Sequence, residues 1–311
     1  MHPGFCAAAV SGINKGAAPR YILRGEPQPG YNTNMRIVTL AENTTVDSRL
    51  HPQHGLSLYI ETQRHKILFD TGADALFLRN AQALGIDLSK VDIVIISHGH
   101  SDHGGGLAAF LQINTVAKVY IRTSAFEPHF VKVLGLKIGV GLQADLAQSE
   151  QIIWVDEELQ IDEELYLFST VAGKALLPTS GGKLYKAATG KPQKDDFTHE
   201  QYLVIAEAGQ KALITGCSHK GIYNIMQSAE DRCGKMDSIV GGFHLFKLPT
   251  HQDALIAALA EKLAESKAAF YTCHCTGKKA YEKMKRVMGD DLHAIHTGSS
   301  FSPQNLPENR D

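Results

Sequence analysis

The stretch VDIVIISHGHSDHGGG, residues 91 to 106, constrains the fold more than any other part of this sequence. Its first part, Val91–Ile96, is apolar apart from Asp92 and rich in β-branched residues, which is typical of a buried strand. Four potential metal ligands follow within six residues: His98, His100, Asp102 and His103. Gly104–Gly106 then permit a tight turn and a close approach of the backbone. Because ligands collect at the carboxyl ends of strands in α/β sheets, we expect this loop to line a site.

The residue types in this loop favour metal chemistry. Neutral imidazole and carboxylate are ligands that borderline divalent metals accept. Four candidates in six residues are too many for one tetrahedral ion bound mainly by this loop, and they suit two adjacent ions completed from elsewhere. The alternative is a polar surface loop that contains histidines by chance, which the strand–loop context disfavours.

The pattern of apolar residues predicts an α/β chain. The first half is rich in short strands, with helices near 74–84 and 105–113. Ile222, Ile225, Met226 and Ala229 follow helical spacing, and from there strands and helices alternate as βαβαβ, which predicts parallel pairing. The predicted strands are 36–41, 56–61, 65–70, 91–97, 118–121, 151–155, 165–170, two in the hairpin 201–215, 237–242, 268–274 and 292–298; the later helices are 221–233, 253–267 and one around 281–288.

Composition sets the domain organisation and excludes some partners. Of 311 residues, 43% are hydrophobic, enough for a sizeable core. Residues 1–34 are rich in Gly, Pro and Ala, and we expect a flexible extension there rather than a signal peptide, because a basic start is lacking. Residues 35–311 are expected to form one domain, with an insertion around 122–200 that lies over the site.

Charge and cysteine content favour a cytoplasmic protein that binds a small molecule. A net charge of -2 gives no reason to expect nucleic acid or an anionic membrane. No apolar run is long enough to span a bilayer. Five cysteines are too few and too oddly placed for a disulfide framework. A homo-oligomer remains open.

The histidine loop resembles the His-x-His-x-Asp-His signature of the metallo-β-lactamase superfamily. ILFDTG (67–72), ALITGCSHKGI (212–222), GGFHL (241–245) and CHCTGKKA (273–280) resemble a narrower branch, which is named for 7,8-dihydropterin-6-methyl-4-(β-D-ribofuranosyl)-aminobenzene-5'-phosphate synthase. The motifs match in order over roughly residues 35–300. The resemblance implies an αββα sandwich of two mixed β-sheets flanked by helices, with metals at one edge and Asp70 orienting the histidine loop.

The resemblance and the strand ends together suggest a ligand set. The first ion would take His98, His100 and His219, and the second would take Asp102, His103 and His274. Cys217 stands where the wider superfamily has a bridging aspartate, so it is either a ligand or a buried inert thiol. His199 occupies the region of the superfamily's third histidine, but the branch does not require one there and we expect it to face solvent.

Further residues are candidates for contact with substrate. His244 follows a predicted strand and two glycines, so it either touches substrate and transfers protons or is structural. His54 is expected to line the pocket. Thr276 and Lys278 open a helix whose backbone N–H groups are suited to an anion such as phosphate, unless this is a plain helix start. Strand alternation predicts that the thiols of Cys273 and Cys275 point away from the side that His274 faces. The remaining histidines, including His65 and His129, receive no site role.

Two adjacent ions, with zinc favoured over manganese or iron, can activate water and polarise a substrate oxygen. Asp102 would then both bind metal and orient the nucleophile. We expect a hydrolase, or a dihydropterin-type synthase as the branch implies, acting on a small phosphate-containing or ester substrate. An iron-dependent oxidoreductase and a non-catalytic metal sensor are the alternatives, and the sequence does not name the substrate.

Overall fold

Two seven-stranded mixed sheets lie face to face in the computed structural model, which describes residues 23, 35–134, 136–178, 183–187, 192–246, 248 and 252–303. Apart from Leu23, the predicted extension 1–34 lies outside the described residues. The first sheet has the order β18 (Ser300–Phe301), β1 (Arg36–Ala41), β2 (Ser57–Glu61), β3 (Lys66–Phe69), β4 (Ile93–Ile95), β5 (Lys118–Arg122) and β8 (Ile152–Val155). Its pairs from β18 to β3 are antiparallel, and those from β3 to β8 are parallel.

The second sheet contains the predicted alternation of strands and helices. Its order is β17 (Leu292–Ala294), β16 (Ala269–Thr272), β15 (Ser238–Gly241), β14 (Gln210–Ile214), β13 (Tyr202–Glu207), β10 (Leu165–Phe168) and β9 (Glu158–Gln160). The strands β14 to β17 are parallel, as the βαβαβ rhythm predicted, and the remaining pairs are antiparallel.

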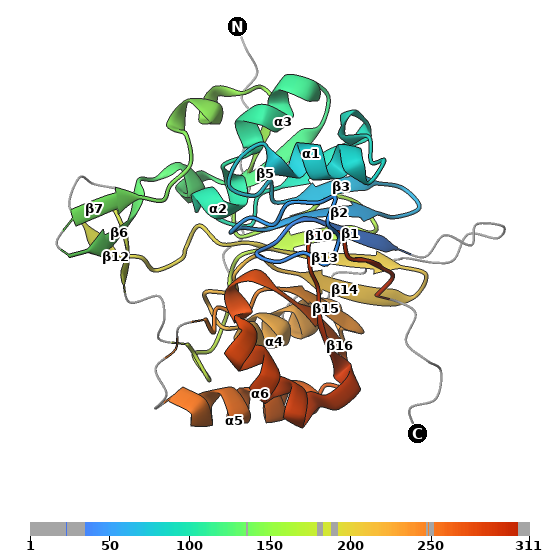
Figure 1. The fold of residues 1–311 in the computed structure, drawn as a ribbon, viewed down its shortest axis with the longest axis vertical. Helices are drawn as coiled ribbons and strands as arrows, with labels where there is room; N and C mark the ends of the chain where they lie inside the picture. The colour runs from blue at the N-terminus through green and yellow to red at the C-terminus, as the bar shows by residue number, and fades with distance from the viewer. Residues whose placement is uncertain are drawn as a thin grey trace, which may run out of the picture.

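Helices cover both outer faces and complete an αββα sandwich (Figure 1). On the first sheet lie α1 (Leu76–Ala83), α2 (Ser101–Gly104) and α3 (Leu107–Ile113); on the second lie α4 (Ile222–Cys233), α5 (Asp253–Ala264) and α6 (Lys278–Met288). Short 3₁₀ turns join several elements: η1 (Leu88–Lys90), η2 (Thr123–Phe126), η3 (Ala144–Gln148), η6 (His274–Thr276) and η7 (Gly289–Asp291). The predicted fold class is confirmed.

Strand alternation divides the apolar side chains among three layers of core. In β2, Leu58 and Ile60 point into the cluster between the sheets, while Tyr59 points to the cluster beneath α1 and α3. A third cluster packs the stripe of α4 against the second sheet, with Ile225 and Met226 fully or almost fully buried. Because both faces of each sheet are covered, its central strands are apolar throughout, as in IVI of β4.

A small antiparallel sheet projects beside the sandwich, with the order β12 (Gln193–Lys194), β11 (Leu184–Lys186), β6 (His129–Val133) and β7 (Leu136–Gly139). It lies within the predicted insertion 122–200. The same range also supplies β8, β9 and β10 to the main sheets, so the added part is shorter than the weak patterning indicated. Among the described residues, no helix is both long and apolar enough to cross a membrane.

Candidate metal centre

The candidate site forms where five strand ends meet at one edge of the sandwich. Asp70 follows β3, the histidine loop follows β4, and β14, β15 and β16 are followed by the segments that carry His219, His244 and His274. Four residues here have positive φ without being glycine: Asp70, Ser218, His244 and His274. Such backbone costs about 1–3 kcal/mol per residue and tends to cluster at functional sites.

The glycines after the histidines allow the loop to pack closely on the segment after β3. A Cβ at Gly105 would collide with the backbone of Ala73, and one at Gly106 would collide with the backbone oxygens of Thr71 and Asp74. The predicted close approach of the backbone is therefore found, although the neighbour is the chain itself.

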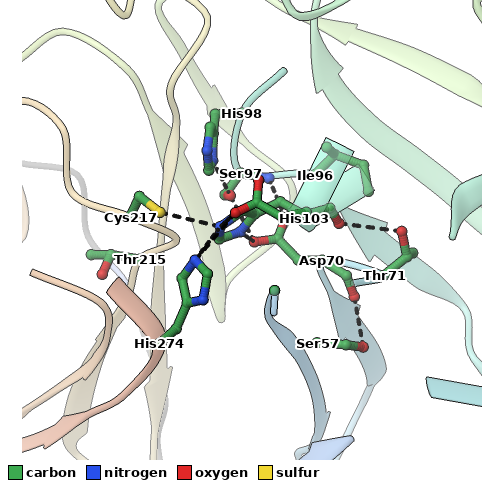
Figure 2. A network of polar contacts seen from close by, with 12 residues as sticks. Ser57, Asp70, Thr71, Ile96, Ser97, His98, His103, Thr215, Cys217 and His274 are labelled. Atoms are coloured by element: carbon green, nitrogen blue, oxygen red, sulfur yellow. Dashed lines mark hydrogen bonds and ion pairs between the residues drawn. The ribbon is translucent and has the colours of Figure 1, made fainter. Parts of the chain in front are cut away.

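Asp70 sets the proton positions of two histidines (Figure 2). Its Oδ2 accepts hydrogen bonds from His103 Nδ1 at 2.6 Å and from the Ser97 hydroxyl at 2.7 Å. Because the Ser97 hydroxyl donates its proton to Asp70, its oxygen must accept the hydrogen bond from His98 Nδ1, at 2.8 Å. Both rings donate from Nδ1, and both direct Nε2 into the site.

A second pair of nitrogens converges between His103 and His274. The Nδ1 of His274 lies 2.9 Å from Oδ1 of Asn43, which also accepts from Gly55 N, so this ring donates from Nδ1. The Nε2 atoms of His103 and His274 then face each other at 3.3 Å. Two lone pairs at this distance repel each other unless a proton or a metal ion lies between them.

Two further donor atoms adjoin this pair of nitrogens. Asp102 Oδ2 lies 3.4 Å from His274 Nε2, and Cys217 Sγ lies 3.2 Å from His103 Nε2. Against the effect of burial, the charges of Asp70 and Asp102 raise the pKa of His103 to about 9. The surroundings of this ring therefore favour a positive charge, and nitrogen, oxygen and sulfur ligands suit a borderline ion such as zinc.

The other three predicted histidines form a separate donor set. His98, His100 and His219 offer nitrogens within 4.8 Å of one another, and all three are buried. Burial lowers the pKa of each ring, most for His98 and His219, so the neutral form that binds metal is favoured. Among the described residues, His98 Nε2 and both ring nitrogens of His219 have no hydrogen-bond partner. Leaving buried nitrogens unpaired is costly, and a metal ion would satisfy them.

Glu200 positions the segment that carries His219, a role that no motif in the sequence indicates. Its buried carboxylate accepts from His219 N at 2.8 Å, from Lys220 N at 3.2 Å and from the Tyr202 hydroxyl at 2.5 Å. Phe197 stacks on the His219 ring, with centroids 4.2 Å apart. In the sequence, the only sign of Glu200 was its place in a Glu–Gln–Tyr stretch that leads into a predicted strand.

The predicted orientation of Cys275 is wrong. Its Sγ accepts a hydrogen bond from His244 N at 3.3 Å, and it offers a ligand atom within 4.8 Å of those of Cys217 and His274. The strand β16 ends at Thr272, and His274 has φ of 49°, so alternation stops before it reaches Cys275. Cys273 does point away, into the core between the sheets.

The prediction that His199 faces solvent is also wrong. Its ring is fully buried, its Nδ1 accepts from Gly99 N at 2.9 Å, and its Nε2 lies 3.2 Å from Asp195. His129, to which we assigned no role, contacts the same carboxylate at 3.1 Å. Although burial opposes ionisation, the three neighbouring rings of His100, His129 and His199 hold the pKa of Asp195 well below its usual range.

The candidates for substrate contact lie around the ions' expected positions. The rings of His244 and His219 are 4.2 Å apart, and the largely exposed His54 reaches Asp102 with its Nε2 at 3.3 Å. A cavity of about 610 Å³ adjoins His274 and is lined also by Asn43, Thr276, Lys278 and Tyr281. The Thr276 hydroxyl is occupied by Thr272 and Phe243 N, whereas the Lys278 side chain is 88% exposed.

With this geometry established, the chain can be compared with known proteins. Residues 52–178, which include the histidine loop, match the profile of the Metallo-beta-lactamase superfamily. Over this segment the chain is similar to that superfamily, and its architecture is the metallo-β-lactamase fold. Relative to the superfamily's usual hairpin ending, this metallo-β-lactamase-fold protein has Cys217 in place of aspartate, and that sulfur lies beside His103.

Relatives cover nearly the whole described fold. A curated relative from Methanocaldococcus jannaschii, 7,8-dihydropterin-6-methyl-4-(beta-D-ribofuranosyl)-aminobenzene-5'-phosphate synthase, is 28% identical over 85% of this chain and 95% of its own. The crystal structure of Tm1679, described as a metal-dependent hydrolase of the β-lactamase superfamily, is 29% identical, with a TM-score of 0.73 over 86% of this chain and 98% of that chain. YhfI from Bacillus subtilis, at 11% identity and a TM-score of 0.51 over 86% and 99% of the two chains, shares the fold.

Proposed function

We propose that this protein is an enzyme with two adjacent divalent metal ions, zinc first among them, that acts on a small anionic substrate containing a phosphate or ester group. The observation that carries the proposal is the pair of Nε2 atoms of His103 and His274, facing each other at 3.3 Å. A second cluster of unpaired histidine nitrogens lies beside it. Similarity to the superfamily supports metal dependence in general.

The chain's residues divide the work at such a centre. His98, His100 and His219 would hold one ion, and Asp102, His103 and His274 the other, with Cys217 beside the second. Ions held there supply Lewis acidity for a substrate oxygen and for water. Asp70 and Asn43 keep the ligand rings oriented, which outer partners of metal ligands commonly do. His244, whose ring lies beside that of His219, would move a proton, and the largely exposed His54 would contact substrate near Asp102.

Two reaction types remain within the proposal. The similar proteins include one described as a synthase and one described as a metal-dependent hydrolase, at almost equal identity. The cavity beside His274 would take the body of the substrate, and Lys278 at its rim would meet an anionic group. Condensation would then release pyrophosphate, and hydrolysis would release an alcohol or a phosphate monoester.

Metal content is the first test. We would measure metals by mass spectrometry on protein made without added metal, together with His219→Ala, His274→Ala and the remote control His65→Ala. We expect about two ions per wild-type chain, about one per chain in each site variant, and no change in the control. Iron in place of zinc would favour the oxidoreductase alternative. One ion that is insensitive to both site variants would overturn the ligand assignment.

Turnover is the second test, on the metal-loaded protein. One assay would follow bis(p-nitrophenyl) phosphate and p-nitrophenyl esters, and a second would follow pyrophosphate release from a pterin pyrophosphate supplied with an aminobenzene riboside phosphate. Activity in either assay that is lost in His274→Ala supports the enzyme proposal and selects the reaction type. Metal-loaded protein that is inactive in both would overturn the proposed substrate class and favour a sensor.

A further inference from the structure

A buried carboxylate outside the proposed ligand set connects the metal centre to the small sheet. Asp195 follows β12, and its side chain is 0% exposed. Three histidines surround it: His129 Nδ1 at 3.1 Å, His199 Nε2 at 3.2 Å and His100 Nε2 at 3.6 Å. Its Oδ1 also accepts from Phe197 N at 2.9 Å. Three histidine rings and one backbone N–H therefore converge on one carboxylate, two of the rings from distant segments.

The proton on His199 can be located from the backbone. Gly99 N donates to His199 Nδ1 at 2.9 Å, and a backbone N–H can only donate. His199 Nδ1 is therefore bare, and in the neutral ring the proton lies on Nε2, where it faces Asp195. His199 consequently has no Nε2 lone pair to offer a metal ion. The four side chains lie close enough to hold a cation, but the proton on His199 opposes that use.

The same reasoning applies to His100. Its Nε2 is buried, with Asp195 Oδ2 as the nearby acceptor at 3.6 Å. A nitrogen lone pair that faces a carboxylate oxygen is repelled, whereas an N–H is attracted. The proton of His100 therefore belongs on Nε2, which leaves Nδ1 bare. His98 and His103 have the opposite arrangement, since each donates from Nδ1 and directs Nε2 into the site.

We propose that Asp195 is a positioning residue that makes His100 present Nδ1 to the first ion, and that His129 and His199 hold Asp195 in place for this task. This inference rests on the proposed metal centre. It also gives the small sheet a role, because His129 opens β6 and Asp195 ends the β12 segment. Further contacts fix that sheet to the loop: Ser101 N donates to Val140 O, and Val140 N donates to His129 O, both at 2.8 Å.

The first experiment is nuclear magnetic resonance of the full chain labelled with ¹⁵N-histidine, without metal and with zinc. Long-range proton–nitrogen spectra report which ring nitrogen carries the proton. We expect Nε2–H for His100 and His199 and Nδ1–H for His98 in both samples, and Nδ1–H alone for His103 once zinc is bound, with zinc on His100 Nδ1. A proton on Nδ1 of His100 in wild type would overturn the inference, whether or not zinc binds.

The second experiment compares Asp195→Asn with Asp196→Asn, a neighbouring exposed carboxylate that pairs with Lys186. Zinc affinity is measured by competition with a chromophoric chelator. We expect Asp195→Asn to weaken one of two zinc ions by about 10–100-fold, and His100 to populate both tautomers. Asp196→Asn should match wild type. If Asp195→Asn fails to fold, His129→Gln replaces it: with one of the rings that hold Asp195 removed, the same zinc ion should bind more weakly and His100 should populate both tautomers, each to a smaller extent than in Asp195→Asn.

The remaining outcomes separate the two proposals. Unchanged zinc affinity and an unchanged His100 tautomer in Asp195→Asn would overturn the role of Asp195 and leave the metal centre intact. A third zinc ion in wild type that is lost in Asp195→Asn would show that the cluster is itself a cation site. Wild-type protein that binds no divalent ion would overturn the proposed function, and with it this inference.

Discussion

The two ends of strands β3 and β4 use histidine in opposite ways. At their amino ends, His65 places Nδ1 2.7 Å from Asp92 and Nε2 2.6 Å from Asp162, so both nitrogens have carboxylate partners. At their carboxyl ends, His98 and His103 each have one partnered nitrogen and one that points into the site. A histidine with an acceptor at each nitrogen is a structural cation, and a histidine with one bare lone pair is a potential ligand.

The difference extends from side chains to backbone. The carboxyl ends carry four non-glycine residues with positive φ and several buried nitrogens without hydrogen-bond partners. Both features lower the stability of the folded protein. At the amino ends, both ring nitrogens of His65 have carboxylate partners. The contact with Asp162, which lies between β9 and β10, joins the two sheets. We therefore expect substitutions at the two ends to change different measurable properties.

The largest expected effect is the loss of activity when a proposed metal ligand at the carboxyl ends is replaced. His274→Ala should reduce kcat/KM by more than about 100-fold, because loss of an outer partner of a ligand alone costs 10–100-fold. The free energy of unfolding of the metal-free protein should change little. Steady-state kinetics and urea denaturation would measure the two effects. His65→Ala is the control, and an equal loss of activity in that variant would remove the proposed contrast.

The next effect separates orientation from ligation. Asp70→Asn should weaken zinc binding by about 10–100-fold, since the amide NH₂ cannot accept a hydrogen bond at one of the two oxygen positions that now serve Ser97 N and the pair of His103 and the Ser97 hydroxyl. Chelator competition would measure the change. Asp92→Asn, the equivalent substitution at the other end, should bind zinc like wild type. Zinc affinity that is insensitive to Asp70→Asn would show that His103 is oriented by packing alone.

A smaller effect on stability is expected at the opposite end. His65→Ala should lower the free energy of unfolding by about 1–2 kcal/mol, because two charge-assisted hydrogen bonds are lost at a partly exposed site. Two carboxylates then remain without their shared partner. Urea denaturation would measure the loss, and metal content should be unchanged. Wild-type stability in this variant would mean that solvent replaces both hydrogen bonds without cost.

The smallest effect is the dependence of that stability on pH. Hydrogen bonding to Asp92, and then to Asp162, raises the pKa of His65 above 6.5 in the folded protein, against burial. Because the folded pKa is higher than the unfolded one, this stabilisation is complete below about pH 6.5 and is lost as pH rises through the folded pKa. The difference in unfolding free energy between wild type and His65→Gln should therefore shrink as pH rises above about 6.5. A difference that grows with pH would show that His65 is neutral.

Periodicity and spacing were enough to predict most of the fold and the centre of the site. The apolar runs gave the sheets and the helical stripe of α4, and the short spacing of His98 to His103 gave the loop at the end of β4. Such features are local, so a single sequence contains them. Six predicted ligands do meet in the structure, although their binding of metal stays a prediction.

The missed features depend on contacts between distant segments. His65 contacts carboxylates 27 and 97 residues away, and His199 accepts a hydrogen bond from the backbone N–H of Gly99, 100 residues away. No local pattern marks such partners. Cys275 was misplaced for a different reason, since the alternation rule holds only while a strand continues and the positive φ of His274 ends it.

The tight packing at Gly105 and Gly106 has a consequence for how descendants of this chain could diverge. A predicted ligand such as His98 can be exchanged for a neutral side chain of similar size, and the expected loss is mainly of metal binding. A side chain at either glycine would push the histidine loop away from the segment after β3 and disturb the sheet edge itself. A lineage that abandoned metal chemistry would therefore be expected to lose its histidines first and keep these glycines, as a trace of the ancestral centre.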